Sequence, residues 1–110
     1  MVDKKIDGEL KNALDSFLHE DYGYSIEIIH RYADNNHVEA CSKLGVAYQL
    51  GLGVSVDIEK AVHYLDKAAA QGSGEAAHNL GTLFAALPNS DIEKAKYWFM
   101  KAKSLNYIRD

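Results

Sequence analysis

Proline, cysteine and long apolar runs are all scarce in this chain of 110 residues. Proline occurs once and glycine eight times, which excludes collagen-like and proline-rich disordered chains. No stretch approaches the roughly 20 apolar residues that a membrane-spanning helix needs, so we expect no membrane partner. One cysteine, Cys41, and a charged first segment without the apolar core of a secretory signal favour a cytoplasmic protein. A signal peptide that had been removed would leave the same appearance.

Basic charge is also limited, and it is unevenly placed. The net charge is −4. Residues 1–39 hold nine acids against four bases, a balance of −5, whereas residues 40–110 hold seven acids against eight bases, a balance of +1. A nucleic-acid-binding protein would carry a basic stripe for the phosphates, so we expect no nucleic-acid partner. The acidic first third instead favours a basic protein as partner.

An internal repeat organises the chain. A shift of 36 residues aligns residues 40–45 with 76–81, and a shift of 34 aligns residues 57–61 with 91–95, because the second copy has two fewer loop residues. A degenerate half copy precedes both, over residues 21–33. Self-similarity of this length is typical of stacked solenoids, whose units need neighbours to bury their apolar faces. The sequence therefore predicts an all-α fold, an α/α solenoid of about six antiparallel helices.

Apolar positions that recur every three or four residues divide each full unit into two helices. With the weaker pattern before residue 37, the expected helices span residues 7–20, 24–35, 38–50, 57–71, 74–86 and 90–105. Gly45 and Gly81 lie inside two of these helices, where glycine costs about 1 kcal/mol relative to alanine. The repetition of this cost predicts close approach of a neighbouring helix at both positions.

Polar residues and glycine mark the expected helix ends. Asp57 and Asp91 stand where a carboxylate can cap a helix N-terminus, and Ser90 with a glutamate three residues later offers a capping box one residue earlier. Three residues that tolerate the left-handed conformation stand at the expected C-termini: Asn36, Gly72 and Asn106.

The central unit resembles a known family. Its motif consists of small, aromatic, charged and glycine residues at fixed spacing: Ala40, Leu44, Gly45, Tyr48, Gly51, Gly53, Val54, Asp57, Lys60, Ala61, Tyr64, Lys67, Ala68, Ala69, Gly72 and Ala76. This pattern resembles the Sel-one-like repeat family, which is related to the tetratricopeptide repeat. The resemblance implies a tetratricopeptide-like superhelix that binds other proteins and usually lacks catalysis. It divides a single domain, residues 1–110, into degenerate capping helices (1–36), a repeat (37–72), a repeat with a shortened loop (73–106) and a tail (107–110).

Catalytic and metal-binding patterns are missing from the sequence. His37 and Cys41 are four residues apart, but two ligands do not make a metal site. The segment Gly51–Val54 follows a predicted helix and lacks a third glycine, so it is a turn and not a dinucleotide-binding loop. We therefore expect no enzyme activity, no cofactor and no metal.

Aromatic residues fall into two groups. We assign the first group to the core because its members occupy repeat-stripe positions: Tyr48, Tyr64, Phe84 and Trp98. The second group does not fit one stripe: Tyr97, Met100, Tyr107 and Ile108. These residues either cap the open end of the solenoid or form an apolar patch for a partner or a second copy. We favour the cap.

A partner is expected on the concave surface, which the first helix of each unit lines in tetratricopeptide relatives. A helical wheel with Leu44 and Leu80 facing inward gives the outward, partner-binding positions: Asn12, Ser16, Glu39, Ser42, Lys43, Val46, Gln49, Glu75, His78, Asn79 and Thr82. The first hypothesis is a non-enzymatic module for one dedicated protein partner, in its narrowest form a bacterial immunity protein or small inhibitor of a basic toxin. The alternative is an adaptor or regulatory scaffold in bacterial signalling, secretion or protein quality control. Either would act as a monomer or weak homodimer.

Overall fold

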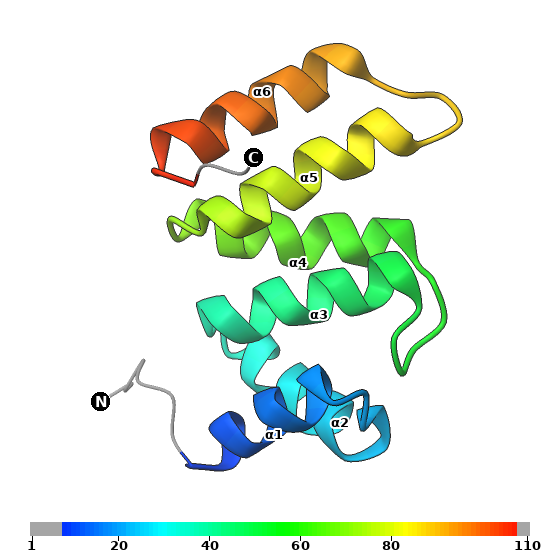
Figure 1. Cartoon of the computed structure of the whole chain (residues 1–110), viewed down its shortest axis with the longest axis vertical. Helices are drawn as coiled ribbons and strands as arrows, with labels where there is room; N and C mark the ends of the chain where they lie inside the picture. Colours follow the sequence, from blue (N-terminus) through cyan, green and yellow to red (C-terminus); the bar gives the residue numbers. More distant parts are fainter. Residues whose placement is uncertain (1–7, 108–110) are drawn as a thin grey trace.

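The computed structural model describes residues 8–107 as a stack of helices and contains no strand in that range. The helices are α1 (Gly8–Leu18), α2 (Tyr22–Asp34), α3 (Val38–Leu50), α4 (Ile58–Ala70), α5 (Gly74–Ala86) and α6 (Ile92–Ser104). Each helix packs on the next one along the chain, and the stack follows the longest axis of the molecule (Figure 1). The predicted all-α solenoid is confirmed.

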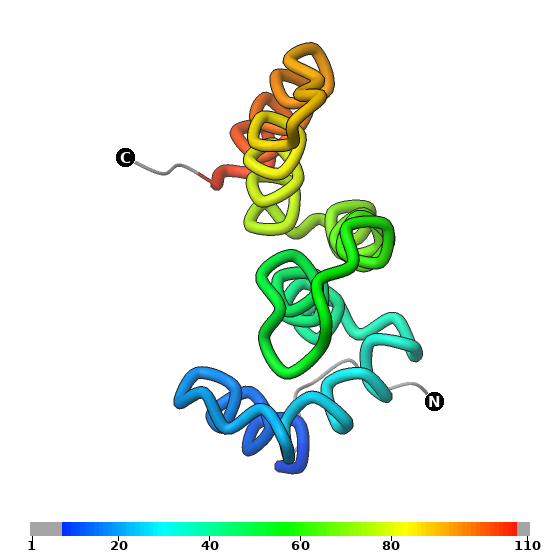
Figure 2. The backbone as a smooth tube through the Cα atoms, turned by 90° about the vertical axis from the view of Figure 1, so that its right-hand side faces the viewer, coloured from blue at the N-terminus to red at the C-terminus, as the bar shows by residue number. Residues whose placement is uncertain are grey.

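The helix hairpins are arranged in chain order from one end of the stack to the other. Figure 2 shows α1 and α2 together at one end, α3 and α4 in the middle, and α5 and α6 at the opposite end. The molecule measures 39 × 30 × 25 Å. Direct packing also joins α3 to α5, the first helices of the two full units. In residues 8–107, every helix is too short or too polar to cross a membrane.

Local rules explain most helix ends. Asn36, Gly72 and Asn106 have φ angles of 64°, 98° and 64°, so all three adopt the predicted left-handed conformation. At the N-termini, the side chains of Asp57 and Asp91 accept hydrogen bonds from the backbone N–H groups three residues later, at 3.1 and 3.0 Å. The alternative capping box at Ser90 is wrong, because Asp91 is the cap residue of α6.

The shortened loop between α5 and α6 ends in the same way as the longer loop between α3 and α4. Helix α5 stops at Leu87, which is extended (ψ 150°) because the residue before a proline avoids the helical region. The backbone N–H of Asp91 then donates to the carbonyl of Phe84 at 3.0 Å, as that of Asp57 donates to the carbonyl of Tyr48 at 2.9 Å. The loss of two residues therefore leaves the start of α6 in its repeat position.

The core runs through the whole stack, and the interior glycines let the helices approach closely. Each helix from α1 to α5 contributes at least one fully buried large apolar side chain, whereas α6 contributes only the buried alanines Ala95 and Ala102. A Cβ atom added at Gly45 would lie 2.6 Å from Leu65, and one added at Gly81 would lie 2.7 Å from Phe99. The predicted close approach is confirmed in both units.

The core assignment of the aromatic residues is confirmed for Tyr48 and Tyr64, whose buried rings stack with centroids 6.0 Å apart. Phe84 and Trp98 are only partly buried. Both belong to the last hairpin of the stack, which packs against another hairpin on one side only. The capping role that we favour for the other group stays a prediction, because Tyr97 and Met100 are 58% and 72% exposed at the end of the stack and their exposure alone does not separate a cap from a patch.

Candidate protein-binding surface

The first helices of the two full units bring part of the predicted partner-binding row together. The side chain of Glu75, from the first turn of α5, accepts a hydrogen bond from the Ser42 hydroxyl at 3.0 Å. The ammonium group of Lys43 lies 3.7 Å from the same carboxylate oxygen. Because Ser42 and Lys43 belong to α3, these contacts link the two first helices across the repeat boundary.

A hollow of about 270 Å³ lies beside these contacts. It is bounded by the start of α3 and by the turn from α4 into α5, and its lining residues are Val38, Glu39, Ser42, Gln71, Gly72, Ser73 and Glu75. Two of its lining residues are glutamates and none is basic. Each glutamate lies in the first turn of its helix, where negative charge also interacts favourably with the helix dipole. The chemistry of the hollow suits a cationic or hydrogen-bond-donating group.

Two members of the predicted row do not face outward. Ser42 is only 3% exposed because its hydroxyl points toward α5. His78 is half-buried, with its ring 5.2 Å from that of Phe99 and 5.4 Å from that of Tyr107. Tyr107 also lies against Gly74 and is partly buried, so the segment after α6 covers this part of α5. Ile108, the remaining member of the expected cap, lies outside the described residues.

The other predicted positions keep access to solvent. Half-buried members of the row on α3 and α5 are Glu39, Lys43, Val46, Gln49, Glu75 and Asn79, and Thr82 is exposed. On α1, Asn12 is exposed and Ser16 is half-buried. Helix α1 packs chiefly on α2, so the packed pair of first helices that carries the row is α3 with α5.

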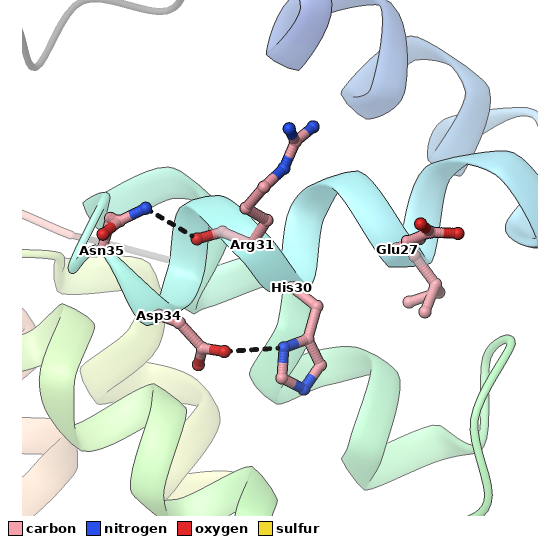
Figure 3. Close-up of a pocket in the computed structure, with 6 residues that line it drawn as sticks. Glu27, His30, Arg31, Asp34 and Asn35 are labelled. Carbon is pink, nitrogen blue, oxygen red and sulfur yellow. Dashed lines mark hydrogen bonds and ion pairs between the residues drawn. The ribbon is translucent and has the colours of Figure 1, made fainter.

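A second hollow, of about 530 Å³, lies along α2 (Figure 3). Its lining residues are Ile26, Glu27, His30, Arg31, Asp34 and Asn35. Figure 3 shows His30 and Asp34 on the same side of α2 and Arg31 on the other. The Arg31 guanidinium donates to the carboxylate of Glu9 in α1 at 2.8 Å. The Nδ1 atom of His30 lies 3.0 Å from the Asp34 carboxylate. His30 and Asp34 are four residues apart, the spacing that places two side chains next to each other on a helix.

Asp34 also joins α2 to α4. The hydroxyl of Tyr64 donates to the Asp34 carboxylate at 2.8 Å, and this bond lowers the pKa of Asp34. Burial, followed by the bond to Asp34, raises the pKa of Tyr64. The Lys67 ammonium donates to the carbonyl of Ala33 at 3.1 Å, so it satisfies the end of α2 as well as lying near the end of its own helix. These two hydrogen bonds therefore hold the α1–α2 hairpin against the α3–α4 hairpin.

The arrangement on α2 has little of what acid–base catalysis requires. The His30 and Asp34 side chains are 38% and 56% exposed, so water solvates both.

The thiol of Cys41 is buried, its Sγ atom donates to the carbonyl of Ala33 at 3.3 Å, and burial raises its pKa. Both effects work against formation of a reactive thiolate. Over residues 8–107, no three His, Cys, Asp or Glu side chains are grouped as metal ligands.

His37 has a structural position at the start of α3. Its Nδ1 atom accepts from the backbone N–H of Ala40 at 3.5 Å, and its ring meets that of Tyr32 edge-on at 6.2 Å. The four-residue spacing between His37 and Cys41 therefore reflects a helix cap followed by a core residue.

The sequence model of the Sel1 repeat matches residues 38–73 and 74–107, which is more than half of the chain. The chain belongs to the Sel1 repeat family. The crystal structure of a Sel1 repeat protein from Oxalobacter formigenes is similar, with a TM-score of 0.73 and 27% identity over 89% of this chain and 82% of that one. Chitin synthase regulatory factor 2 of Schizosaccharomyces pombe is 35% identical over 52 residues, which are 47% of this chain and 10% of that protein.

The Sel1 match helps to rank the two hollows. Sel1 repeats generally mediate protein–protein interactions. The residues that line the hollow between α3 and α5 all lie within the matched residues, at the boundary of the two repeats. Those that line the hollow on α2 all precede the match. The surface formed by α3 and α5 is therefore the stronger candidate for protein binding.

Proposed function

We propose that this Sel1 repeat chain binds a dedicated protein partner on the surface formed by α3 and α5, and that a basic side chain of the partner enters the hollow beside Glu39 and Glu75. One observation carries the proposal: two carboxylates from successive repeats line one hollow that contains no basic lining residue. Lysine and arginine are the protein side chains that match such a pair. The net negative charge of the chain supports the choice of a basic partner.

The existing contacts indicate how the partner's cation would bind. Glu75 is already held by Ser42 and Lys43, so its carboxylate is fixed in direction before the partner arrives. Its side chain is 43% exposed, which leaves room for a further donor but weakens the electrostatic gain through solvent. We expect each glutamate to contribute about 1 kcal/mol, which corresponds to a factor of about five in the dissociation constant.

The class of partner decides between two forms of the proposal. An immunity protein or inhibitor of a basic toxin draws support from the acidic first third of the chain. An adaptor or regulatory scaffold draws support from the similarity to part of a chitin synthase regulatory factor. Titration calorimetry separates them, because inhibition requires one partner at nanomolar affinity, whereas an adaptor binds several at micromolar affinity.

Conservative variants test the surface itself. The partner that copurifies with the chain from its own cell is titrated with Glu39→Gln and Glu75→Gln variants, which keep side-chain size and a carbonyl acceptor. Each change should weaken binding about fivefold. Glu59→Gln, on an exposed position of α4 outside the hollow, is the matched control and should bind as the unaltered chain does.

A stronger perturbation tests the rest of the row. Lys43→Glu combined with Asn79→Arg changes charge on both first helices. Unaltered binding by this double variant would refute the assignment of the partner to the surface formed by α3 and α5.

A further inference from the structure

The outer face of α6 is apolar and basic at the same time. Three of its large apolar side chains are more than half exposed: Ile92, Tyr97 and Met100. Around them stand exposed Lys96, Lys101 and Lys103, and the whole helix carries four lysines against one glutamate. We call this surface the α6 face. Nothing among residues 8–107 covers it.

The repeat shows that this chemistry is specific to α6. At a shift of 34 residues, Tyr97 and Met100 correspond to His63 and Asp66 of α4, which are polar and also exposed. The stack therefore has no need for an apolar residue at either position. At a third position the difference is reversed: the exposed, basic Lys96 of α6 corresponds to the half-buried, apolar Val62 of α4. Helix α6 thus carries both apolar and basic groups on a surface that faces solvent.

The complementary chemistry lies at the other end of the same chain. Residues 8–37 hold six acids against two bases, a balance of −4. The turn between α1 and α2 carries exposed Glu20 and Asp21, and exposed Leu18 and Tyr24 flank them at 68% and 45%. We call this surface the α1–α2 corner. Figures 1 and 2 show that α1 and α2 lie at one end of the stack and α6 at the other.

We propose that the α6 face of one chain binds the α1–α2 corner of a second copy, so that chains associate head to tail. Lysines around Tyr97 and Met100 would meet Glu20 and Asp21, while Leu18 and Tyr24 supply apolar contact. The two surfaces differ and lie at opposite ends, so the contact is heterologous and extends into short open chains instead of closing as a twofold dimer. This inference concerns a different surface from that formed by α3 and α5 and does not depend on it.

The association should be weak and sensitive to salt. One helix face and one interhelical turn form a contact at the small end of specific interfaces. Its charges are exposed, and salt screens exposed charges over about 10 Å at 0.1 M. We therefore expect sedimentation velocity to show a weight-average sedimentation coefficient that rises with protein concentration in about 0.03 M salt and stays at the monomer value in about 0.5 M salt.

Introducing the residues of α4 at the equivalent positions of α6 tests the apolar part of the α6 face. The variant Tyr97→His/Met100→Asp places on α6 the residue types that α4 carries at the equivalent exposed positions, so it should fold normally. We expect it to remain monomeric at low salt. The matched control is Leu50→Asp, which removes an apolar side chain that is 60% exposed at the end of α3 and should associate as the unaltered chain does.

A charge exchange tests the pairing of the two ends. Lys96→Glu/Lys101→Glu makes the α6 face acidic, and Glu20→Lys/Asp21→Lys makes the α1–α2 corner basic. Circular dichroism checks that both variants are folded. Each variant alone should be monomeric at low salt, and an equimolar mixture should associate, because each α6 face then finds a corner of opposite charge on the other variant.

Two results would overturn the proposal. The unaltered chain could stay monomeric at low salt, or each charge variant could associate alone as strongly as the unaltered chain. If the unaltered chain stays monomeric, we test whether it sediments with phosphatidylserine vesicles and whether Tyr97→His/Met100→Asp abolishes that binding. If both are observed, the α6 face binds an anionic membrane.

Discussion

Alanine at Gly45 and at Gly81 should affect stability differently, although the two glycines occupy equivalent positions. A Cβ atom at Gly45 would lie 2.6 Å from Cγ and 2.7 Å from Cδ2 of Leu65, and 3.2 Å from its backbone nitrogen. At Gly81 the obstacle is the ring of Phe99, with its Cδ1 and Cε1 atoms both at 2.7 Å. Leu65 is fully buried, whereas Phe99 is 37% exposed. The leucine therefore has no free space to move into, and the phenylalanine can turn toward solvent.

The magnitudes follow from two opposing terms. Replacing an interior helical glycine by alanine stabilises the helix by about 1 kcal/mol. Overpacking of a closed core costs about 1–3 kcal/mol. For Gly45→Ala the full cost of overpacking applies, because Leu65 cannot move, so we expect a net destabilisation of about 1 kcal/mol. For Gly81→Ala most of the clash is relieved by ring movement, so the free energy of unfolding should stay the same or rise by up to about 1 kcal/mol.

Urea denaturation followed by circular dichroism measures both effects. A difference of about 1–2 kcal/mol between the variants corresponds to a difference in melting temperature of roughly 4–16 °C for a domain of this size. Gly23→Ala is the control, because a Cβ atom there would meet nothing within 4 Å and only the helix preference changes. Equal stability of Gly45→Ala and Gly81→Ala, or a stabilised Gly45→Ala, would refute the reasoning from close packing.

Three further predictions concern single side chains. Asp57→Ala should lower the free energy of unfolding by about 1 kcal/mol, because the Asp57 carboxylate caps α4. Asp21→Ala should lower it less, because the Asp21 side chain makes no capping hydrogen bond. Thermal melts of the two variants compare these losses. Tyr64→Phe should destabilise by about 1 kcal/mol at pH 7. Because the folded-state pKa of Asp34 is lowered, that contribution is present above the ordinary aspartate pKa of about 3.9 and is lost as the pH falls through the folded-state value, so acid titrations of wild type and variant should converge there. Cys41 should react with a thiol reagent at pH 8 only as fast as the fold opens, and rapid labelling without urea would contradict its burial.

The features that sequence predicted well depend on neighbours close in the chain. The φ angles of Asn36 and Gly72 follow from the need to end a helix, and the cap at Asp57 follows from its own next turn. The Sel1 pattern also fixed the pairing of helices, because Gly45 and Gly81 mark where a following helix must approach.

The features that sequence missed depend on contacts between distant segments. Ser42 faces inward because its hydroxyl donates a hydrogen bond to Glu75 of the next repeat, 33 residues away. His78 is covered by Tyr107, which lies beyond the last repeat helix. The bond from Tyr64 to Asp34 spans 30 residues. A helical wheel divides a helix into inner and outer faces but contains no information on which neighbour covers the boundary between them.

The two predicted uses of the last aromatic group, cap or patch, are separable by stability. A solenoid needs a polar outer face on its terminal unit, and Lys96 and Lys103 meet that need, whereas Tyr97 and Met100 do not. If Tyr97 and Met100 acted as a cap, replacing them by polar residues would unfold the last hairpin. Both are more than half exposed, so Tyr97→His/Met100→Asp should change the free energy of unfolding by less than about 0.5 kcal/mol in high salt, where the chains are separate. A loss of 2 kcal/mol or more, on the order of a core substitution, would mean that these side chains hold the end of the stack together.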